Sequence, residues 1–159
     1  MKDDEVRARQ QLEEIKVILK DSKYKMRDYS FPVIPESYYI ESKEAAEAIK
    51  EIIKELNKQP INIAVLNTRV DTARDLVLKL YARTKEMVKN ARLAETAIVY
   101  GNRYRPLDDN LDKYLQTAEL LFFKGEYNKS LEITLNALNR IDSGAMDRLM
   151  TIYNNQVER

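Results

Sequence analysis

The sequence predicts an all-α protein, and three of its features support that prediction. Glycine occurs three times and proline four times in 159 residues, so few turns can form and the elements between them must be long. Hydrophobic residues make up 44% and charged residues 33%, a balance typical of a folded chain. From residue 63 to residue 100 there is neither glycine nor proline, and apolar side chains recur there at alternating steps of four and three, the spacing of a helical seam.

The first predicted helix spans about residues 2–28, with apolar side chains at helical spacing: Leu12, Ile15, Leu19 and Met26. Asp3 is a weak candidate for its N-cap. Because so charged a start lacks a natural stop signal, we expect the sequence to begin inside a longer helix; a frayed natural N-terminus is the alternative. We expect no signal peptide, since charged residues and no apolar region follow Met1.

Residues 29–36 interrupt the helical pattern, because Pro32 and Pro35 cannot lie in a helix interior. The P-x-x-P spacing is also that of a polyproline ligand. Apolar residues in so short a turn favour instead the closure of the end of a bundle: Phe31, Val33 and Ile34.

The second predicted helix runs from about Glu36 to Asn57. Its apolar stripe consists of five residues: Ala45, Ile49, Ile52, Ile53 and Leu56. A turn containing Pro60 follows, and Asn62 is the expected N-cap of the next helix.

The third predicted helix, residues 63 to about 100, is about 57 Å long. Its seam demands packed helical partners along its length, and it comprises Leu66, Val70, Ala73, Val77, Leu80, Thr84, Met87, Ala91, Ala94 and Ile98. Further apolar residues predict contact with more than one helix: Val65, Leu76, Tyr81 and Val88. At its end, Gly101 is expected to adopt a left-handed C-terminal cap, with Pro106 preventing continuation.

Three shorter helices complete the prediction. Asp108 or Asp109 caps the fourth, whose stripe is Leu111, Leu115, Ala118, Leu121 and Phe122. A tight turn at residues 124–127 leads to the fifth, with Leu131, Leu135, Leu138 and Ile141. After Ser143 and Gly144, the sixth carries Leu149, Ile152 and Tyr153. Their short loops predict antiparallel neighbours.

These elements predict two domains. Residues 1–83 would form a three-helix bundle from the first two helices and the first half of the long one. Residues 84–159 would form a second bundle from the remainder. One long central helix shared by successive antiparallel bundles is an elongated, spectrin-like layout.

The composition argues against an enzyme. The chain contains no histidine and no cysteine, which removes the residues of catalytic triads, zinc sites and thiol nucleophiles. Its three glycines are isolated, so no phosphate-binding loop is expected. We therefore predict no catalytic residue, cofactor or metal. A net charge of +1 predicts no nucleic-acid partner, and the basic cluster at residues 20–27 is better explained by helix-dipole complementation.

Two segments are candidates for partner binding. The stretch Phe123 to Leu131 resembles the inter-helix turn of a tetratricopeptide repeat, but only one copy is present, and a packing role for this hairpin is favoured. The second segment is residues 100–105, Tyr-Gly-Asn-Arg-Tyr-Arg. Tyrosine and arginine are frequent interface anchors, although a plain helix C-terminus explains the same residues.

Three stretches carry a family resemblance: residues 29–36, residues 60–77 with their Leu-Asn-Thr-Arg-Val-Asp-Thr-Ala-Arg-Asp-Leu-Val run, and residues 100–105. Together they resemble the EzrA family of bacterial septation ring formation regulators. The hairpin around Gly125 is similar as well, so the resemblance covers nearly the whole chain.

The resemblance implies a cellular role. Members of this family carry an N-terminal membrane helix followed by spectrin-like cytoplasmic bundles, so this chain would be a C-terminal fragment at the cytoplasmic face of the membrane, at the division septum. They bind the tubulin-like protein FtsZ, restrain its ring and link it to cell-wall synthesis. The implied partners are FtsZ and other division or cell-wall synthesis proteins, with no direct membrane contact by this fragment.

The resemblance also implies a polar patch of Gln, Asn and Arg that supports septal recruitment. Asn102 and Arg103 align with it, and Val99 stands directly before the tyrosine, where the glutamine is expected. The partner-binding residues implied are Tyr100, Asn102, Arg103, Tyr104 and Arg105. Two alternatives remain open: a passive spectrin-like spacer and a tetratricopeptide-like peptide adaptor.

Overall fold

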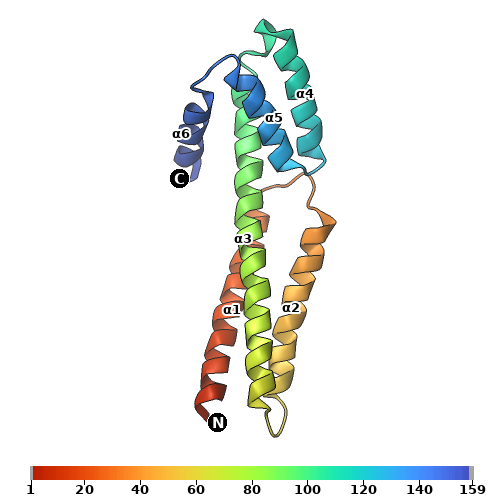
Figure 1. Cartoon of the computed structure of the whole chain (residues 1–159), viewed down its shortest axis with the longest axis vertical. Helices are drawn as coiled ribbons and strands as arrows, with labels where there is room; N and C mark the ends of the chain where they lie inside the picture. The colour runs from red at the N-terminus through yellow and green to blue at the C-terminus, as the bar shows by residue number, and fades with distance from the viewer. Residues whose placement is uncertain (1, 158–159) are drawn as a thin grey trace. The chain divides into compact units, whose positions relative to one another are not determined.

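The computed structural model describes residues 2–157. Over this range the chain is helical and contains no strand, which confirms the all-α prediction (Figure 1). The helices are α1 (Lys2–Asp28), α2 (Glu36–Leu56), α3 (Ile63–Gly101), α4 (Asp109–Phe123), α5 (Tyr127–Asn139) and α6 (Ala145–Val157). A short 3-10 turn that the sequence pattern did not predict, η1 (Arg105–Leu107), precedes α4.

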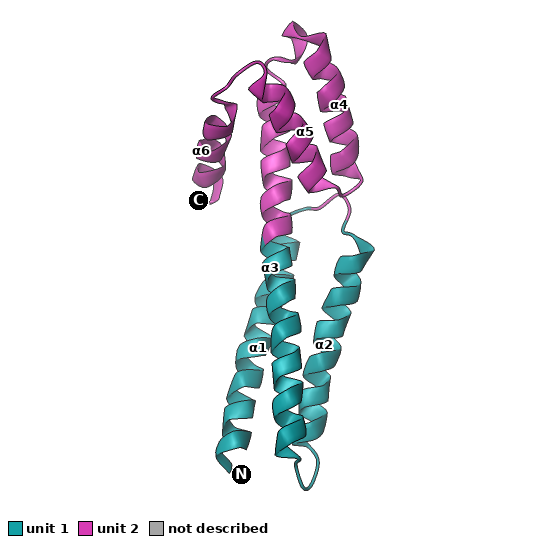
Figure 2. Cartoon of the chain, in the orientation of Figure 1, with its two compact units in different colours: residues 1–30, 34–85 teal, residues 31–33, 86–159 magenta. Residues whose placement is uncertain are grey.

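The helices group into two compact units (Figure 2). Unit 1 comprises Met1–Ser30 and Ile34–Lys85, and unit 2 comprises Phe31–Val33 and Glu86–Arg159. Helix α3 contributes residues to both. The predicted folding domains, residues 1–83 and 84–159, and their spectrin-like arrangement remain predictions.

The core of unit 1 follows the predicted stripes of α1, α2 and α3. Its buried apolar residues include Leu12, Ile15, Leu19, Ala45, Ile49, Ile52, Leu56, Leu66, Val70, Ala73, Val77 and Leu80. Ile53 belongs to the predicted stripe of α2 but is 37% exposed, because one residue after Ile52 the helix has turned by about 100°. Burying these apolar surfaces contributes roughly 25 cal/mol per Å².

Several polar side chains in unit 1 have hydrogen-bonding or ion-pair partners. The hydroxyls of Tyr38 and Thr84 lie 2.7 Å apart. Asn62 is the N-cap of α3 as predicted, its Oδ1 accepting a hydrogen bond from the Val65 N–H at 3.2 Å. Glu55 accepts from the Asn62 N–H at 3.0 Å and pairs with Lys58 at 2.9 Å. Lys58 first and this backbone bond second lower the pKa of Glu55.

Unit 2 has its own core, which joins the end of α3 to α4, α5 and α6. It comprises Ala97, Tyr100, Leu111, Leu115, Ala137, Leu138, Ala145 and Leu149. The predicted stripe of α5 was partly wrong: Ile141 is 40% exposed and lies beyond the helix. The small residues Ser130 and Thr134 are fully buried instead, because each hydroxyl donates to a backbone carbonyl, that of Ala118 and that of Ser130 respectively.

The α4–α5 turn is closed by glycine and an aromatic cluster. Gly125 has φ +87°, and the N–H groups of Gly125 and Glu126 donate to the carbonyls of Phe122 and Leu121. This is a Schellman motif. Tyr127 is 3% exposed, and its ring packs against those of Phe31 and Phe122 at 5.6 and 5.2 Å.

The Tyr127 hydroxyl donates to the backbone carbonyl of Val33 and accepts from its N–H at 3.3 Å. The proline-containing turn is thereby held on unit 2 through Phe31 and the Val33 backbone. The tetratricopeptide-like hairpin therefore uses its tyrosine for packing.

Candidate interaction site

The five predicted contact residues lie where α3 ends. Tyr100 is in its last turn and is 4% exposed. Asn102 and Arg103 are exposed, whereas Tyr104 and Arg105 are half-buried. The five residues are thus close together around the end of α3, but their exposure differs widely; that they bind a partner stays a prediction.

Gly101 corrects one expectation about this turn. The prediction of a left-handed cap is wrong, because Gly101 is helical and has no positive φ. A Cβ at this position would lie 3.2 and 3.3 Å from the two Leu115 methyls and 3.5 Å from a Leu138 methyl. Glycine therefore serves here to let α4 and α5 side chains approach the backbone, and the chain turns through 3-10-type bonds such as Tyr104 N–H to Gly101 O at 3.0 Å.

Tyr100 is the centre of a polar network that reaches the start of α6. Its hydroxyl donates to Asp142 Oδ2 at 2.8 Å and accepts from Arg148 at 3.2 Å. Arg148 also pairs with Asp142, and Tyr104 reaches the same carboxylate at 3.5 Å. The Tyr100 hydrogen bond, followed by the Gly144 N–H and the Arg148 charge, holds the pKa of Asp142 below its usual value.

Arg105 ties the turn to α4. Its guanidinium forms ion pairs with Asp112 and Glu119, and it donates to Asn102 Oδ1 at 3.1 Å. Asp112 first and Glu119 second raise the pKa of Arg105 above its usual value. Arg105 is therefore a positioning residue whose charge is neutralised within the chain.

Arg103 differs from the other residues of the turn. Its guanidinium lies 4.4 Å from the centroid of the Tyr100 ring, a cation–π geometry. Within residues 2–157, no carboxylate pairs with it. Arg103 is thus an exposed cation held in place by a buried aromatic ring.

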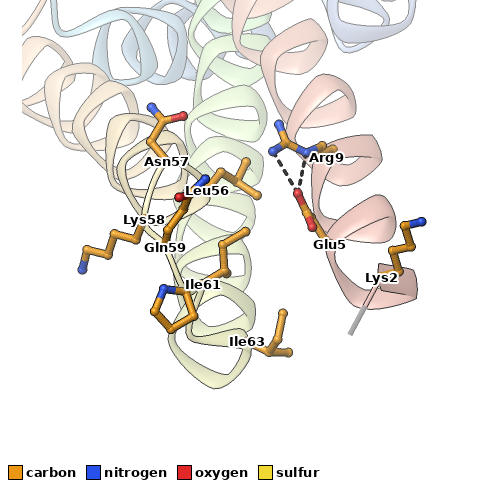
Figure 3. A pocket seen from close by; sticks show the side chains of 10 residues that line it. Lys2, Glu5, Arg9, Leu56, Asn57, Lys58, Gln59, Ile61 and Ile63 are labelled. Carbon is orange, nitrogen blue, oxygen red and sulfur yellow. Dashed lines mark hydrogen bonds and ion pairs between the residues drawn. The ribbon is translucent and has the colours of Figure 1, made fainter.

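A second candidate site is a cavity of about 560 Å³ in unit 1, between the start of α1 and the α2–α3 turn (Figure 3). Apolar and charged side chains line it: Lys2, Glu5, Arg9, Leu56, Lys58, Ile61 and Ile63. Arg9 pairs with Glu5 at 3.0 Å, and Lys58 pairs with Glu55 at 2.9 Å. Because these pairs neutralise most of the rim, the cavity favours no particular ligand chemistry.

The described residues provide neither a metal-binding cluster nor a membrane-spanning helix. Residues 2–157 hold no group of three or more acidic, histidine or cysteine side chains placed to bind a metal. In the same range, every helix is too short or too polar to cross a bilayer.

Comparison with known proteins decides the family. The model of the family described as "Septation ring formation regulator, EzrA" matches residues 1–153. The chain belongs to the EzrA family. No solved structure is significantly similar to it.

Individual EzrA proteins are about 30% identical to this chain. Septation ring formation regulator EzrA of Geobacillus kaustophilus is 31% identical over 146 residues, which are 92% of this chain and 26% of that protein. EzrA of Bacillus pumilus is 29% identical over 150 residues, 94% and 26% of the two chains. EzrA of Listeria monocytogenes is 30% identical over 158 residues, 99% and 28%. The chain spans about a quarter of the length of these curated relatives.

Sequence reasoning missed the residues that hold the EzrA-like turn in place. Asp112 and Glu119 are seven residues apart on α4, a spacing that places both on one helix face. Their common face could therefore have been predicted from the sequence. The roles of Asp142 and Arg148 could not, because their partner Tyr100 is more than forty residues earlier in the chain. Val99, at the position expected for glutamine, is 63% exposed.

Proposed function

We propose that this chain is a protein-interaction segment of a negative regulator of the bacterial division ring. It binds FtsZ and other division or cell-wall synthesis proteins and scaffolds the septum. Membership of the EzrA family supports the role in septation. The observation that carries the proposal is the exposed Arg103, stacked on Tyr100 beside the exposed Asn102.

We assign two different roles to the five candidate residues. Tyr100, Tyr104 and Arg105 hold the turn through Asp142, Asp112 and Glu119. Asn102 and Arg103 contact the partner. A pre-positioned arginine loses little conformational freedom on binding, which favours its use as an interface anchor.

The proposed location is the cytoplasmic face of the cell membrane at the septum, with the anchor in another part of the parent protein. The fragment itself contacts neither membrane nor nucleic acid. Its net charge of +1 provides no broad attraction for either polyanion.

Co-sedimentation with polymerised FtsZ tests the proposal. The wild-type chain is expected to sediment with the polymers, and the Asn102→Ala, Arg103→Ala variant is expected to stay in the supernatant with unchanged helicity by circular dichroism. Arg140→Ala is the matched control, because Arg140 is also exposed and also lies over a tyrosine ring, that of Tyr114 at 5.5 Å. Equal sedimentation of wild type and double variant would refute the assignment of the contact residues.

A passive spacer is the second candidate function. The internal use of Tyr100, Tyr104 and Arg105 favours it, since these residues have a structural role without any partner. A spacer predicts that every exposed substitution is silent, whereas a core change such as Leu80→Asp abolishes function by unfolding unit 1. Failure of the wild-type chain to bind FtsZ or any other division protein would favour this reading.

A further inference from the structure

The outward side of α1 carries a line of apolar side chains (Figure 1). Val6, Val17 and Tyr24 are 62%, 65% and 66% exposed. They follow one another by eleven and seven residues, close to whole numbers of helical turns, so all three lie on one side of the helix. The buried residues of α1, among them Ile15 and Leu19, lie on the opposite side. This line of side chains is therefore a surface separate from the core of unit 1.

Three basic side chains flank the C-terminal half of this line. Lys20, Lys23 and Arg27 are exposed, and they follow one another by three and four residues, the spacing of neighbours on a helix surface. Within residues 2–157, no carboxylate lies within ion-pair distance of any of them. The carboxylate of Asp21, which is close in sequence, pairs instead with Lys25 at 4.0 Å. The surface thus combines apolar groups with three uncompensated positive charges.

The helix dipole accounts for only part of this positive charge. Its effect falls off within the last turn of a helix, and the basic residues in the last turn of α1 are Lys25 and Arg27. Lys20 and Lys23 lie before that turn, where the dipole gives a cation little stabilisation. The explanation that the sequence favoured for the whole basic cluster therefore covers Arg27 but leaves Lys20 and Lys23 without a structural role.

We propose that Val17, Lys20, Lys23, Tyr24 and Arg27 form a docking surface for an acidic amphipathic helix of a protein partner. The surface lies on α1, away from the residues of the α3–α4 turn in the sequence, so the inference goes beyond the proposed function. The seven-residue separation of Val17 and Tyr24 is that of the heptad repeat, by which two helices pack along one another. Carboxylates of the partner helix pair with the three cations, and its apolar stripe covers Val17 and Tyr24.

The charge pattern of α1 favours a protein helix over a membrane or a nucleic acid. Anionic membranes recruit clusters of about four to eight basic residues, and nucleic acids recruit an extended basic stripe. In the N-terminal half of α1 the arginines are neutralised, because Arg7 pairs with Asp4 and Arg9 pairs with Glu5. Three uncompensated cations beside two apolar groups at heptad spacing match a short helix with a local acidic charge.

NMR titration of the isotope-labelled chain with two capped helical peptides tests this chemistry. The acidic probe is two copies of Leu-Glu-Ala-Leu-Glu-Glu-Ala, and the neutral probe has glutamine in place of every glutamate. The acidic peptide is expected to bind about tenfold more tightly, because three exposed ion pairs form. It should shift the amide resonances of Val17, Lys20 and Tyr24.

Two sets of variants separate the contributions of charge and apolar contact. The triple variant Lys20→Gln, Lys23→Gln, Arg27→Gln should bind both peptides equally, and Val17→Gln with Tyr24→Gln should weaken both alike. The matched control changes three other exposed lysines that have no ion pair within the described residues, and it should keep the tenfold preference: Lys79→Gln, Lys113→Gln and Lys124→Gln.

Three outcomes would overturn the inference. The first is equal binding of the two peptides by the wild-type chain, and the second is a preference that persists in the triple variant. The third is a stronger shift of the same resonances by phosphatidylglycerol vesicles than by the acidic peptide, which would assign the surface to a membrane. The Asn102→Ala, Arg103→Ala variant should bind the acidic peptide like wild type, so failure of the proposed FtsZ contact leaves this result unchanged.

Discussion

The turns at the two ends of α4 each place a glycine near a tyrosine, yet they use these residues differently. In the α4–α5 turn, Gly125 takes a positive φ and Tyr127 is buried among aromatic rings. In the α3–α4 turn, Gly101 is helical and leaves room for Leu115, while Tyr100 is hydrogen-bonded to Asp142.

A glycine at a helix end can therefore have two separate structural roles. One is backbone freedom, which only a positive φ reveals. The other is the absence of a Cβ where another helix packs closely. The α4–α5 turn is held mainly by packing and the α3–α4 turn mainly by charges. Within the described residues, the α3–α4 turn also keeps an exposed arginine that has no carboxylate partner, Arg103.

The largest expected effect comes from Leu115, whose methyls lie where a Gly101 Cβ would be. Leu115→Ala should destabilise the chain by about 3 kcal/mol by leaving a cavity. In that background, Gly101→Ala should stabilise the chain by about 1 kcal/mol, because the helix gains propensity and the contact is gone. Urea unfolding of the four chains of this cycle measures both. Identical effects of Gly101→Ala in the two backgrounds would contradict the close-approach role of Gly101.

Gly125→Ala should have a smaller but clear effect. The left-handed backbone costs a Cβ-bearing residue about 1–2 kcal/mol, and the new Cβ would lie 3.3 Å from Val33 Cγ1. In the wild-type background, Gly101→Ala should change the free energy of unfolding by less than about 0.5 kcal/mol, since propensity and crowding offset each other. The contrast between the turns fails if the two substitutions cost the same.

Acid should destabilise the α3–α4 turn, where Asp142 binds Tyr100, and leave the α4–α5 turn unchanged. The folded pKa of Asp142 is lowered, chiefly by Tyr100, so its contribution to stability is present above the unfolded pKa of about 3.9 and is lost as pH falls through the folded pKa. Burial raises the pKa of Tyr127, so that hydroxyl stays neutral throughout this range. Melting temperatures of the wild type should therefore fall more between about pH 5 and pH 3 than those of Asp142→Asn. Parallel curves would show that Asp142 contributes no acid-sensitive stability.

Periodicity predicted the buried face of α3 from Leu66 to Thr84, because a continuously packed seam repeats the same physical demand at every turn. Toward the end of α3 the predicted seam was partly wrong: Ile98 is only partly buried, whereas Ala97 and Tyr100, which lie outside it, are buried.

Periodicity also failed at Ile53 and Ile141, where an apolar residue lies just off the buried face, and at Ser130 and Thr134, where small size and a backbone acceptor make burial of a hydroxyl favourable.

The candidate turn itself could be located from its tyrosines and arginines. Which residues of the turn are buried and which are exposed could not be predicted from the sequence, because Asp142 and Arg148 contact Tyr100 only in the folded chain.

The most direct test of the central claim compares Arg103→Gln with Arg105→Gln in the full-length protein, for septal recruitment, and in this chain, for thermal unfolding. If Arg103 is an outward contact on a structural turn, Arg103→Gln should lose recruitment while its melting temperature stays within about 2 °C of wild type. Arg105→Gln should lower the melting temperature, because Asp112 and Glu119 lose their partner. Normal recruitment of Arg103→Gln, or a loss of stability equal to that of Arg105→Gln, would contradict the account.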